Sequence, residues 1–297
     1  MPESLMLRQQ LRESINAEIV ARTAAHQARL AQVNVGRAAL AAGAPGSPLV
    51  MLAHGDSWFD YPLDGNGPTF GTTDVIQQLG SLGAINPIIL NISHYGDAST
   101  DEMSLPKQQR MIQALQDPKN WGPSHGPDAI LVSCGGNDMA GDQFCIFLDQ
   151  AGSGGDGLDN ARFAGVLGMV KAGFLDLFDF RDRHAPGVPV FAHCYDFPIP
   201  NGVHPICAGP WLQPSLNFAG WTDVAQGTAI VRRALLGFKA MLAELAAVQG
   251  NNFVLVDTQG TLAVADWANE LHPFPDGFKK VAGKFVDALK SAFPNRI

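Results

Sequence analysis

The feature of this sequence that most constrains its fold is a series of five short apolar runs separated by helical stretches. The apolar runs span 49–53, 87–92, 129–133, 188–192 and 253–256. Continuous apolar runs of this length are typical of strands that are buried on both faces of a parallel sheet. The helical stretches span 74–80, 104–116, 162–184, 228–249 and 276–293. This alternation predicts an α/β fold, a three-layer αβα sandwich with a central parallel sheet of about five strands.

We expect residues 1–47 to form a helical extension that precedes the sandwich. Four apolar residues recur at every fourth position, Leu7, Leu11, Ile15 and Ile19. Neither Gly nor Pro interrupts residues 3–34, and the pattern breaks at the Gly- and Pro-rich segment 43–48. An apolar stripe on a helix needs a partner surface. That surface is either the chain's own domain or a second copy, in which case the helix forms a homodimer.

Residues 48–297 then form one domain with two insertions, near 139–160 and 196–226. Both insertions follow the carboxyl ends of predicted strands. Active sites of open α/β sheets lie at that edge. We therefore expect both insertions to border a cleft.

Composition narrows the classes of partner. The chain of 297 residues has a formal net charge of -8 and a pI near 5.4, which argues against binding to nucleic acid or to an anionic membrane surface. The sequence contains no run of about 18 apolar residues, so it predicts no membrane-spanning helix. The polar start, residues 1–10, lacks the apolar segment of a signal peptide, so we expect a cytoplasmic protein.

The four cysteines show no metal-binding or disulfide-scaffold spacing. Reduced thiols are the default for so few cysteines in a chain of this length. One bridge, between Cys194 and Cys207, is the alternative.

Polar residues that suit acyl transfer follow the first three runs. Ser57 lies in Gly55-Asp56-Ser57, directly after the first run, and not in a Gly-x-Ser-x-Gly elbow of the kind that α/β-hydrolases use. A serine hydroxyl needs a general base to act as a nucleophile, and the developing oxyanion needs hydrogen-bond donors. Gly96 follows the second run and can offer a backbone N–H, whereas Asn137 follows the third and can donate from its side chain. The candidate base is His272, shortly before the last helix.

The order of these segments resembles the blocks of the SGNH (GDSL-type) hydrolase superfamily. Gly55-Asp56-Ser57 is similar to block I, residues 91–99 around Gly96 to block II, residues 135–138 with Asn137 to block III, and His272 to the His of block V. The resemblance covers about 48–293. It implies a flavodoxin-like αβα fold that uses neither a metal nor an organic cofactor. It also implies Ser57 as nucleophile, His272 as base, and an oxyanion hole of the Ser57 and Gly96 N–H groups and the Asn137 amide.

One position departs from the pattern of that family. Block V is usually Asp-x-x-His, but here Asn269 holds the place of the Asp. An Asn can orient the His ring without stabilising its charge, and in serine proteases the Asp-to-Asn change costs about 10⁴ in turnover. Asp266 and Glu270 are close in sequence and could take over that role, with Asp266 the better candidate. A Ser–His pair without a carboxylate is the other possibility.

The resemblance implies an esterase whose partner is a small ester: a short acyl ester, an acetylated sugar, a lysophospholipid or a thioester. Two alternatives stay open. The chain could be a weakly active or non-catalytic binding module on the same fold. Less favoured is a metal-dependent phosphoesterase, whose ligands would come from residues near strand ends: His54, His94, His193, Asp56, Asp60 and Asp138. Packed, hydrogen-bonded histidines are the default expectation for the three His.

Overall fold

A single five-stranded parallel sheet organises the chain. The computed structural model describes residues 3–36, 46–63, 71–122, 126–203 and 209–297. The strands are β1 (Val50–Gly55), β2 (Ile88–Asn91), β3 (Ala129–Ser133), β4 (Val190–His193) and β5 (Phe253–Val256), in the order β2-β1-β3-β4-β5. This is the flavodoxin-like order. The predicted parallel sheet is therefore confirmed. The order of the strands reverses at β1, so the crevice between the carboxyl ends of β1 and β3 is the expected place for a site.

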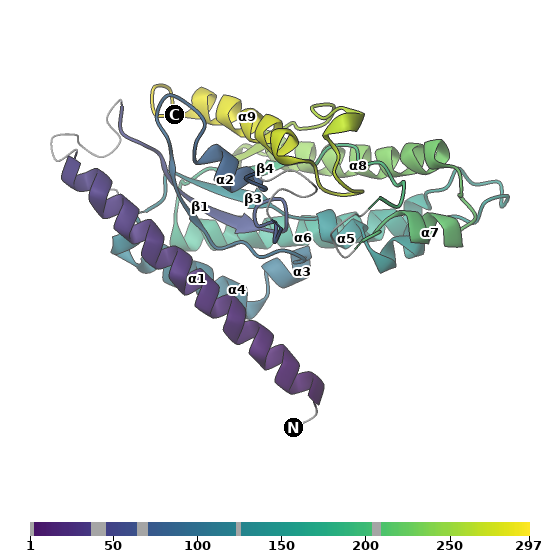
Figure 1. The fold of residues 1–297 in the computed structure, drawn as a ribbon, viewed down its shortest axis with the longest axis horizontal. Helices are drawn as coiled ribbons and strands as arrows, with labels where there is room; N and C mark the ends of the chain where they lie inside the picture. Colours follow the sequence, from purple (N-terminus) through teal and green to yellow (C-terminus); the bar gives the residue numbers. More distant parts are fainter. Residues whose placement is uncertain (1–2, 37–45, 64–70, 123–125, 204–208) are drawn as a thin grey trace.

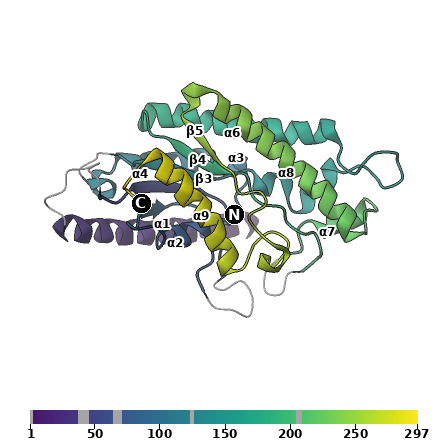
Figure 2. The same cartoon turned by 90° about the horizontal axis from the view of Figure 1, so that it is seen from above.

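Helices cover both faces of this sheet, as the sandwich prediction requires. One face carries α2 (Val75–Leu79) and α9 (Pro275–Ala292), which lie side by side, and the other carries α4 (Leu105–Gln116), α6 (Asn160–His184) and α8 (Val224–Ala247) (Figures 1 and 2). Three shorter helices lie in the connections: α3 (Ser99–Glu102), α5 (Gly136–Met139) and α7 (Gln213–Phe218). Among the described residues, no helix combines the length and apolar content of a membrane span.

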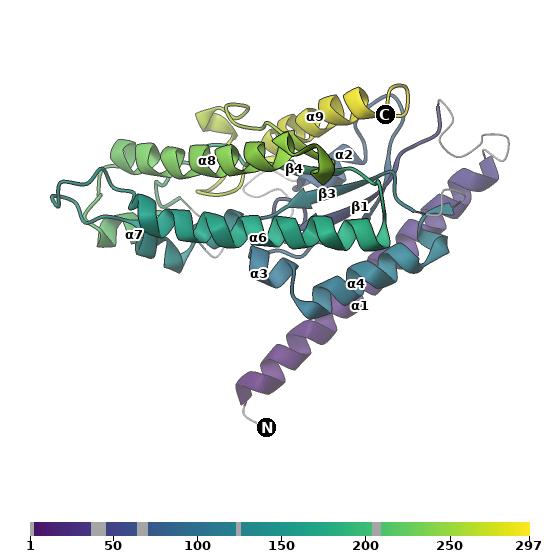
Figure 3. The ribbon, with the colours of Figure 1, turned by 180° about the vertical axis from the view of Figure 1, so that it is seen from behind.

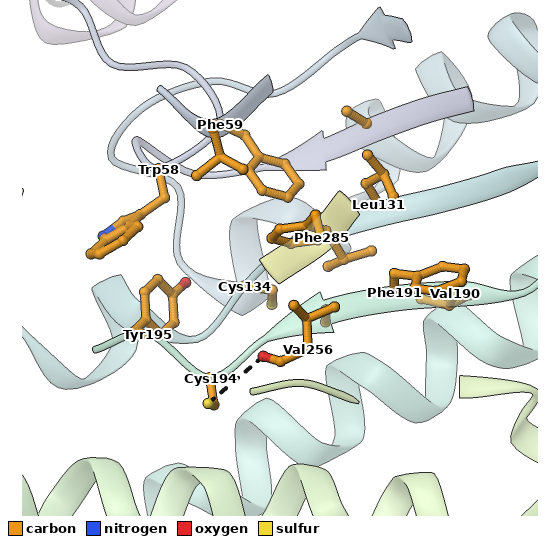
Figure 4. Close-up of a cluster of buried hydrophobic side chains, with 14 of the residues drawn as sticks. Trp58, Phe59, Leu131, Cys134, Val190, Phe191, Cys194, Tyr195, Val256 and Phe285 are labelled. Carbon is orange, nitrogen blue, oxygen red and sulfur yellow. Dashed lines mark hydrogen bonds between the residues drawn. The ribbon is translucent and has the colours of Figure 1, made fainter. Parts of the chain in front are cut away.

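The core between the sheet and α9 is built from aromatic side chains. Phe285 of α9 is fully buried and packs edge-on against Phe59, with ring centroids 5.7 Å apart. Figure 4 shows these two rings in one cluster with Leu131 of β3, while Trp58 and Tyr195 lie beyond the strand ends. The apolar core thus continues directly into the segment that follows β1.

The N-terminal helix α1 (Glu3–Gly36) lies against the β2 edge of the sheet and extends away from it toward its N-terminus (Figures 1 and 3). Its C-terminal half contacts its own chain: His26 Nε2 lies 2.8 Å from the Asn120 carbonyl oxygen, and Gln27 donates to Asp117. Farther toward the N-terminus, Met6 and Leu11 are exposed. A homodimer through this helix stays a prediction, and sedimentation velocity would test it.

Candidate active site

Ser57 and His272 meet at the carboxyl end of β1. The Ser57 hydroxyl oxygen lies 2.7 Å from Nε2 of His272, although the two residues are 215 positions apart. Gly55 lets β1 approach β3 closely, because a Cβ at this position would lie 2.4 Å from the Ser133 carbonyl oxygen of β3. The next residue, Asp56, donates its backbone N–H to that same carbonyl over 3.0 Å. The tight contact between β1 and β3 therefore sets the position of Ser57.

His272 lies in an aromatic surrounding that keeps its ring neutral. Its side chain is almost fully buried, and the rings of Tyr61, Trp58 and Trp211 lie 4.4, 6.5 and 5.6 Å from it, centroid to centroid. Burial lowers the pKa of His272 to about 3. At neutral pH the ring is uncharged, and a neutral imidazole nitrogen can accept the proton of a serine hydroxyl.

Asn269 contacts the main chain that carries His272. Its Oδ1 accepts hydrogen bonds from the N–H groups of Leu271 and His272, over 3.0 and 2.8 Å. Its Nδ2 donates to the hydroxyl of Tyr61, which itself packs on the His272 ring. Asn269 is buried. These contacts shape the turn before His272 and hold the backbone to which the His272 ring is attached.

The two acidic residues near His272 in sequence have other partners. Both carboxylate oxygens of Asp266 lie 2.7 Å from Lys280 Nζ, and one of them also accepts the Ala263 N–H. Glu270 is fully buried. Its carboxylate accepts four backbone N–H groups of the second insertion, from Gly202, Trp211, Leu212 and Gln213. Sequence reasoning considered both residues only as partners of His272, whereas Glu270 joins the His272 loop to the insertion.

The candidate oxyanion donors differ in where they lie. Asn137 of α5 lines the same cavity as Ser57 and His272, and its Nδ2 donates to the Asp97 carbonyl over 2.9 Å. Gly96, with a φ of +81°, is exposed in the turn before α3, outside the cavity lining. The structure thus brings three of the predicted residues onto one cavity and places Gly96 in a neighbouring turn.

Sequence reasoning missed a buried hydrogen-bond chain that joins three strand ends. The Tyr195 N–H donates to Nδ1 of His193, which places the His193 proton on Nε2, 2.9 Å from the Ser133 hydroxyl oxygen. The Ser133 hydroxyl donates to Asp56 Oδ1 over 2.6 Å, and the Tyr195 hydroxyl donates to Asp56 Oδ2 over 2.5 Å. The Tyr195 hydroxyl also accepts the N–H of Gly136 over 3.1 Å. This hydrogen-bond chain therefore connects Asp56, the residue before Ser57, with Gly136, the residue before Asn137.

Two further observations mark this hydrogen-bond chain as unusual. Burial raises the pKa of Asp56 to about 6, and the hydrogen bonds from Ser133, Tyr195 and the Trp58 N–H oppose that rise. Tyr195 has a φ of +53°, a left-handed conformation that costs an aromatic residue roughly 1–3 kcal/mol. The position of Tyr195, two residues after β4, was the only signal in the sequence.

The three histidines that could have formed a metal site make separate contacts. His54 Nε2 lies 3.0 Å from the Glu102 carbonyl oxygen, His94 stacks on Tyr95, and His193 belongs to the hydrogen-bond chain above. In the part of the chain that the structure describes, no three His, Cys, Asp or Glu side chains come together as metal ligands.

Cys194 is a free thiol that lies 3.5 Å from a carboxylate oxygen of Asp257. Its candidate partner for a bridge, Cys207, lies outside the described residues.

Comparison with known proteins gives matches only among solved structures. No family model and no curated protein matches the sequence. An extracellular lipase from Streptomyces rimosus is 18% identical, with 82% of this chain and 98% of that chain covered and a TM-score of 0.49. A lipase from a goat rumen metagenome is 15% identical, with 81% and 97% covered and a TM-score of 0.49. A member of the lipolytic protein G-D-S-L family from Veillonella parvula is 18% identical, with 81% and 97% covered and a TM-score of 0.41.

Identities of this size leave the function to be inferred from this chain's own side chains. The sheet has the flavodoxin-like order that the sequence resemblance implies. Ser57, Asn137 and His272 lie on one cavity at the expected edge of that sheet. In its sequence blocks, its fold and the placement of these three residues, the chain resembles the SGNH hydrolases.

Proposed function

We propose that this protein is a serine hydrolase that cleaves a carboxylic ester through an acyl-enzyme on Ser57. The observation that carries the proposal is the 2.7 Å contact between the Ser57 hydroxyl and Nε2 of the buried, neutral His272. A nucleophile within hydrogen-bond reach of a general base is the arrangement that covalent catalysis by serine needs.

In the proposed reaction, His272 Nε2 takes the hydroxyl proton of Ser57 while Oγ attacks the ester carbonyl carbon. The protonated Nε2 then gives this proton to the alcohol oxygen as the bond between that oxygen and the carbonyl carbon breaks. A water molecule, deprotonated by His272, attacks the acyl-enzyme. Proton return to Ser57 Oγ releases the acid and restores the site.

Asn137 is the proposed side-chain donor to the oxyanion, with the N–H groups of Ser57 and Gly96. An amide nitrogen carries two hydrogens, so Asn137 Nδ2 can bind the Asp97 carbonyl with one and the oxyanion with the other. An Asn137→Ala variant should lose roughly 10²–10³ in kcat with a smaller change in KM, because an oxyanion donor acts mainly in the transition state. A change in KM alone would make Asn137 a substrate-binding residue instead.

We further propose that neither Asp266 nor Glu270 is the acid partner of His272. The carboxylates of Asp266 and Glu270 bind Lys280 and the second insertion, respectively, and Asn269 holds the main chain before the ring.

The test is covalent labelling together with hydrolysis of an aryl ester. Wild-type protein should react with a fluorophosphonate at Ser57 and show burst release of 4-nitrophenol, whereas Ser57→Ala should do neither and melt at the same temperature. Ser291→Ala, on the exposed side of α9, is the matched control and should behave as wild type. If Ser57→Ala keeps more than a few percent of turnover, Ser57 is not the nucleophile. If wild-type protein neither labels nor hydrolyses, the binding module is the better interpretation.

A further inference from the structure

The cavity beside Ser57 and His272 has apolar walls. Its apolar lining includes Met139, Phe144, Leu212, Val231, Ala234 and Leu235. Met139 and Phe144 belong to the first insertion and Leu212 to the second, while the last three lie on α8. These six apolar side chains thus come from three separate segments that meet next to the nucleophile.

The α8 wall is fixed in place by the helix that carries it. Val231, Ala234 and Leu235 have the spacing of one helical face and are almost fully buried. Phe144 and Leu212, on the facing segments, are buried as well. A wall of closely packed side chains on a long helix limits the length of whatever enters.

Among the described residues that line the cavity, the charged groups are acidic and already hydrogen-bonded. Asp196 accepts the N–H groups of Phe197, Gly260 and Leu262, over 2.6 to 2.7 Å. Asp56 belongs to the hydrogen-bond chain described above. Of the described residues that line the cavity, none is Lys or Arg. An anionic group would be repelled there, and a hydroxylated one would lose hydrogen bonds to water.

The cavity has a volume of about 60 Å³. A space of about 10–15 Å³ on this measure holds one water-sized group, so the cavity has room for roughly four to six such groups. A butanoyl group fills this space, an acetyl group leaves part of it empty, and an octanoyl group exceeds it.

We infer that the cavity beside Ser57 is an acyl pocket that selects short, uncharged, unsubstituted acyl chains, from acetyl to butanoyl. The inference rests on the proposed function, since it assigns the acyl side of the same reaction. Among the ester classes that the sequence left open, it favours short acyl esters over lysophospholipids. Each added methylene that the pocket buries should raise kcat/KM about fourfold, so butanoate, with two more methylenes, should exceed acetate about fifteenfold.

The experiment varies the two sides of the ester separately. In the first series the alcohol is 4-nitrophenol and the acid is acetate, butanoate, octanoate or the monoanion of succinate. In the second series the acid is butanoate and the alcohol changes from ethanol to octanol. We expect kcat/KM to peak at butanoate and to fall at least tenfold for octanoate and succinate, with a smaller dependence on the alcohol.

Two substitutions on α8 test the wall itself. Ala234→Leu should fill the pocket and reverse the preference, so that acetate becomes better than butanoate. Leu235→Ala should lengthen the pocket and raise kcat/KM for octanoate, relative to that for butanoate, at least tenfold. This second variant tests the wall even if Ala234→Leu does not fold. Leu236→Ala is the matched control, since Leu236 is the next residue and is 45% exposed.

The outcomes separate this inference from the proposed function. If no ester is hydrolysed and no fluorophosphonate labels Ser57, the proposed function fails. If esters are hydrolysed but octanoate or succinate is preferred, the acyl-pocket inference is wrong while the serine hydrolase stands. If kcat/KM follows the alcohol chain and ignores the acid, the cavity binds the alcohol and the inference is equally overturned.

Discussion

The Tyr195 hydroxyl donates a hydrogen bond to the Asp56 carboxylate over 2.5 Å and links β4 to the turn that carries Ser57. Since the same hydroxyl accepts the Gly136 N–H, one side chain holds both the turn before the nucleophile and the turn before Asn137. Gly136 lies so close to the Tyr195 ring that a Cβ there would stand 2.8 Å from it. The two turns are therefore mechanically coupled through Tyr195.

We predict that Tyr195→Phe lowers kcat about tenfold with little change in KM. Loss of the hydroxyl leaves the Gly136 N–H without its acceptor and removes a donor from Asp56, a change of roughly 1–2 kcal/mol. Steady-state kinetics with an aryl ester measures the effect. In a double-mutant cycle with Asp56→Asn, the two substitutions should be clearly less than additive, because both break the same link. Additive losses would mean that the two residues act independently.

The acid limb of the pH–activity profile should report Asp56 and not His272. As the pH falls, Asp56 gains a proton near its raised pKa of about 6, while His272 stays neutral until its lowered pKa of about 3. A protonated Asp56 can no longer accept from both Ser133 and Tyr195, so kcat should fall between about pH 7 and pH 5 in the wild type.

In Asp56→Asn this limb should disappear, leaving a lower activity that is flat down to about pH 5, because His272 is still neutral there. Circular dichroism at each pH checks that the protein remains folded. If the variant retains an acid limb near pH 6.5, the ordinary pKa of a histidine governs the reaction and burial does not control His272 as described.

Removal of metal ions should leave ester hydrolysis unchanged. The six residues weighed as ligands have partners within the chain; for example, Asp138 accepts from the N–H and hydroxyl of Ser99, and Asp60 pairs with Arg22. Dialysis against EDTA and 1,10-phenanthroline, followed by the aryl ester assay, measures this. Activity that disappears and returns on addition of Zn²⁺ or Mn²⁺ would favour the metallohydrolase.

The strands were predictable from sequence because burial on both faces leaves a direct pattern. The run 129–133 was predicted and observed as β3 with identical bounds. The short helices α3, α5 and α7, of four to six residues, were not predicted, whereas the five-residue α2 falls within the predicted stretch 74–80. The pairing of Ser57 with His272 followed from the order of the blocks, which the strand ends bring to one edge.

Side-chain partners across the site were harder to predict because they depend on the path of irregular segments. Tyr195 has no signal in the sequence beyond its position after β4, and its link to Asp56 appears only when β4 and β1 are placed in the sheet. Glu270 looked like a candidate for the triad acid. Its four N–H donors come from a segment 57–68 residues earlier in the chain, whose course follows no periodic pattern.

The two carboxylates near His272 should respond to substitution in opposite ways. Glu270→Gln replaces one acceptor oxygen by an NH₂ group that faces backbone donors in a buried place, so we predict a loss of roughly 2–4 kcal/mol in the free energy of unfolding. Activity should fall too, because Trp211 beside His272 and Leu212 on the cavity are held by this carboxylate. Urea unfolding and kinetics measure the two effects.

Asp266→Asn should be nearly silent in both measurements, since its ion pair with the half-exposed Lys280 is worth about 1 kcal/mol or less. This order reverses the expectation from sequence, which favoured Asp266 as the partner of His272. If Asp266→Asn instead lowers turnover by a factor of roughly 10² or more, as the loss of a triad acid does, and leaves stability unchanged, Asp266 regains that role.

Arg22 of the N-terminal helix contacts two segments that carry proposed site residues. Arg22 Nη2 lies 2.5 Å from a carboxylate oxygen of Asp60, three residues after Ser57. Arg22 Nη1 donates to the carbonyl of Ser93, three residues before Gly96, over 3.1 Å. One side chain of α1 therefore joins the turn of the nucleophile to the turn that holds a proposed oxyanion donor.

We predict that Arg22→Lys lowers kcat/KM about fivefold to tenfold, because a single ammonium cannot match the fork geometry that binds Asp60 and Ser93 together. Arg22→Gln should lose at least as much, since this substitution would leave the buried Asp60 without its charge partner. Arg12→Gln is the matched control on the same helix: Arg12 is exposed, and its loss should change neither kcat/KM nor the melting temperature. Kinetics and thermal melts on the three variants decide the matter. If Arg22→Lys and Arg22→Gln lower the melting temperature but keep wild-type kcat/KM, α1 only covers the edge of the sheet and does not position the site.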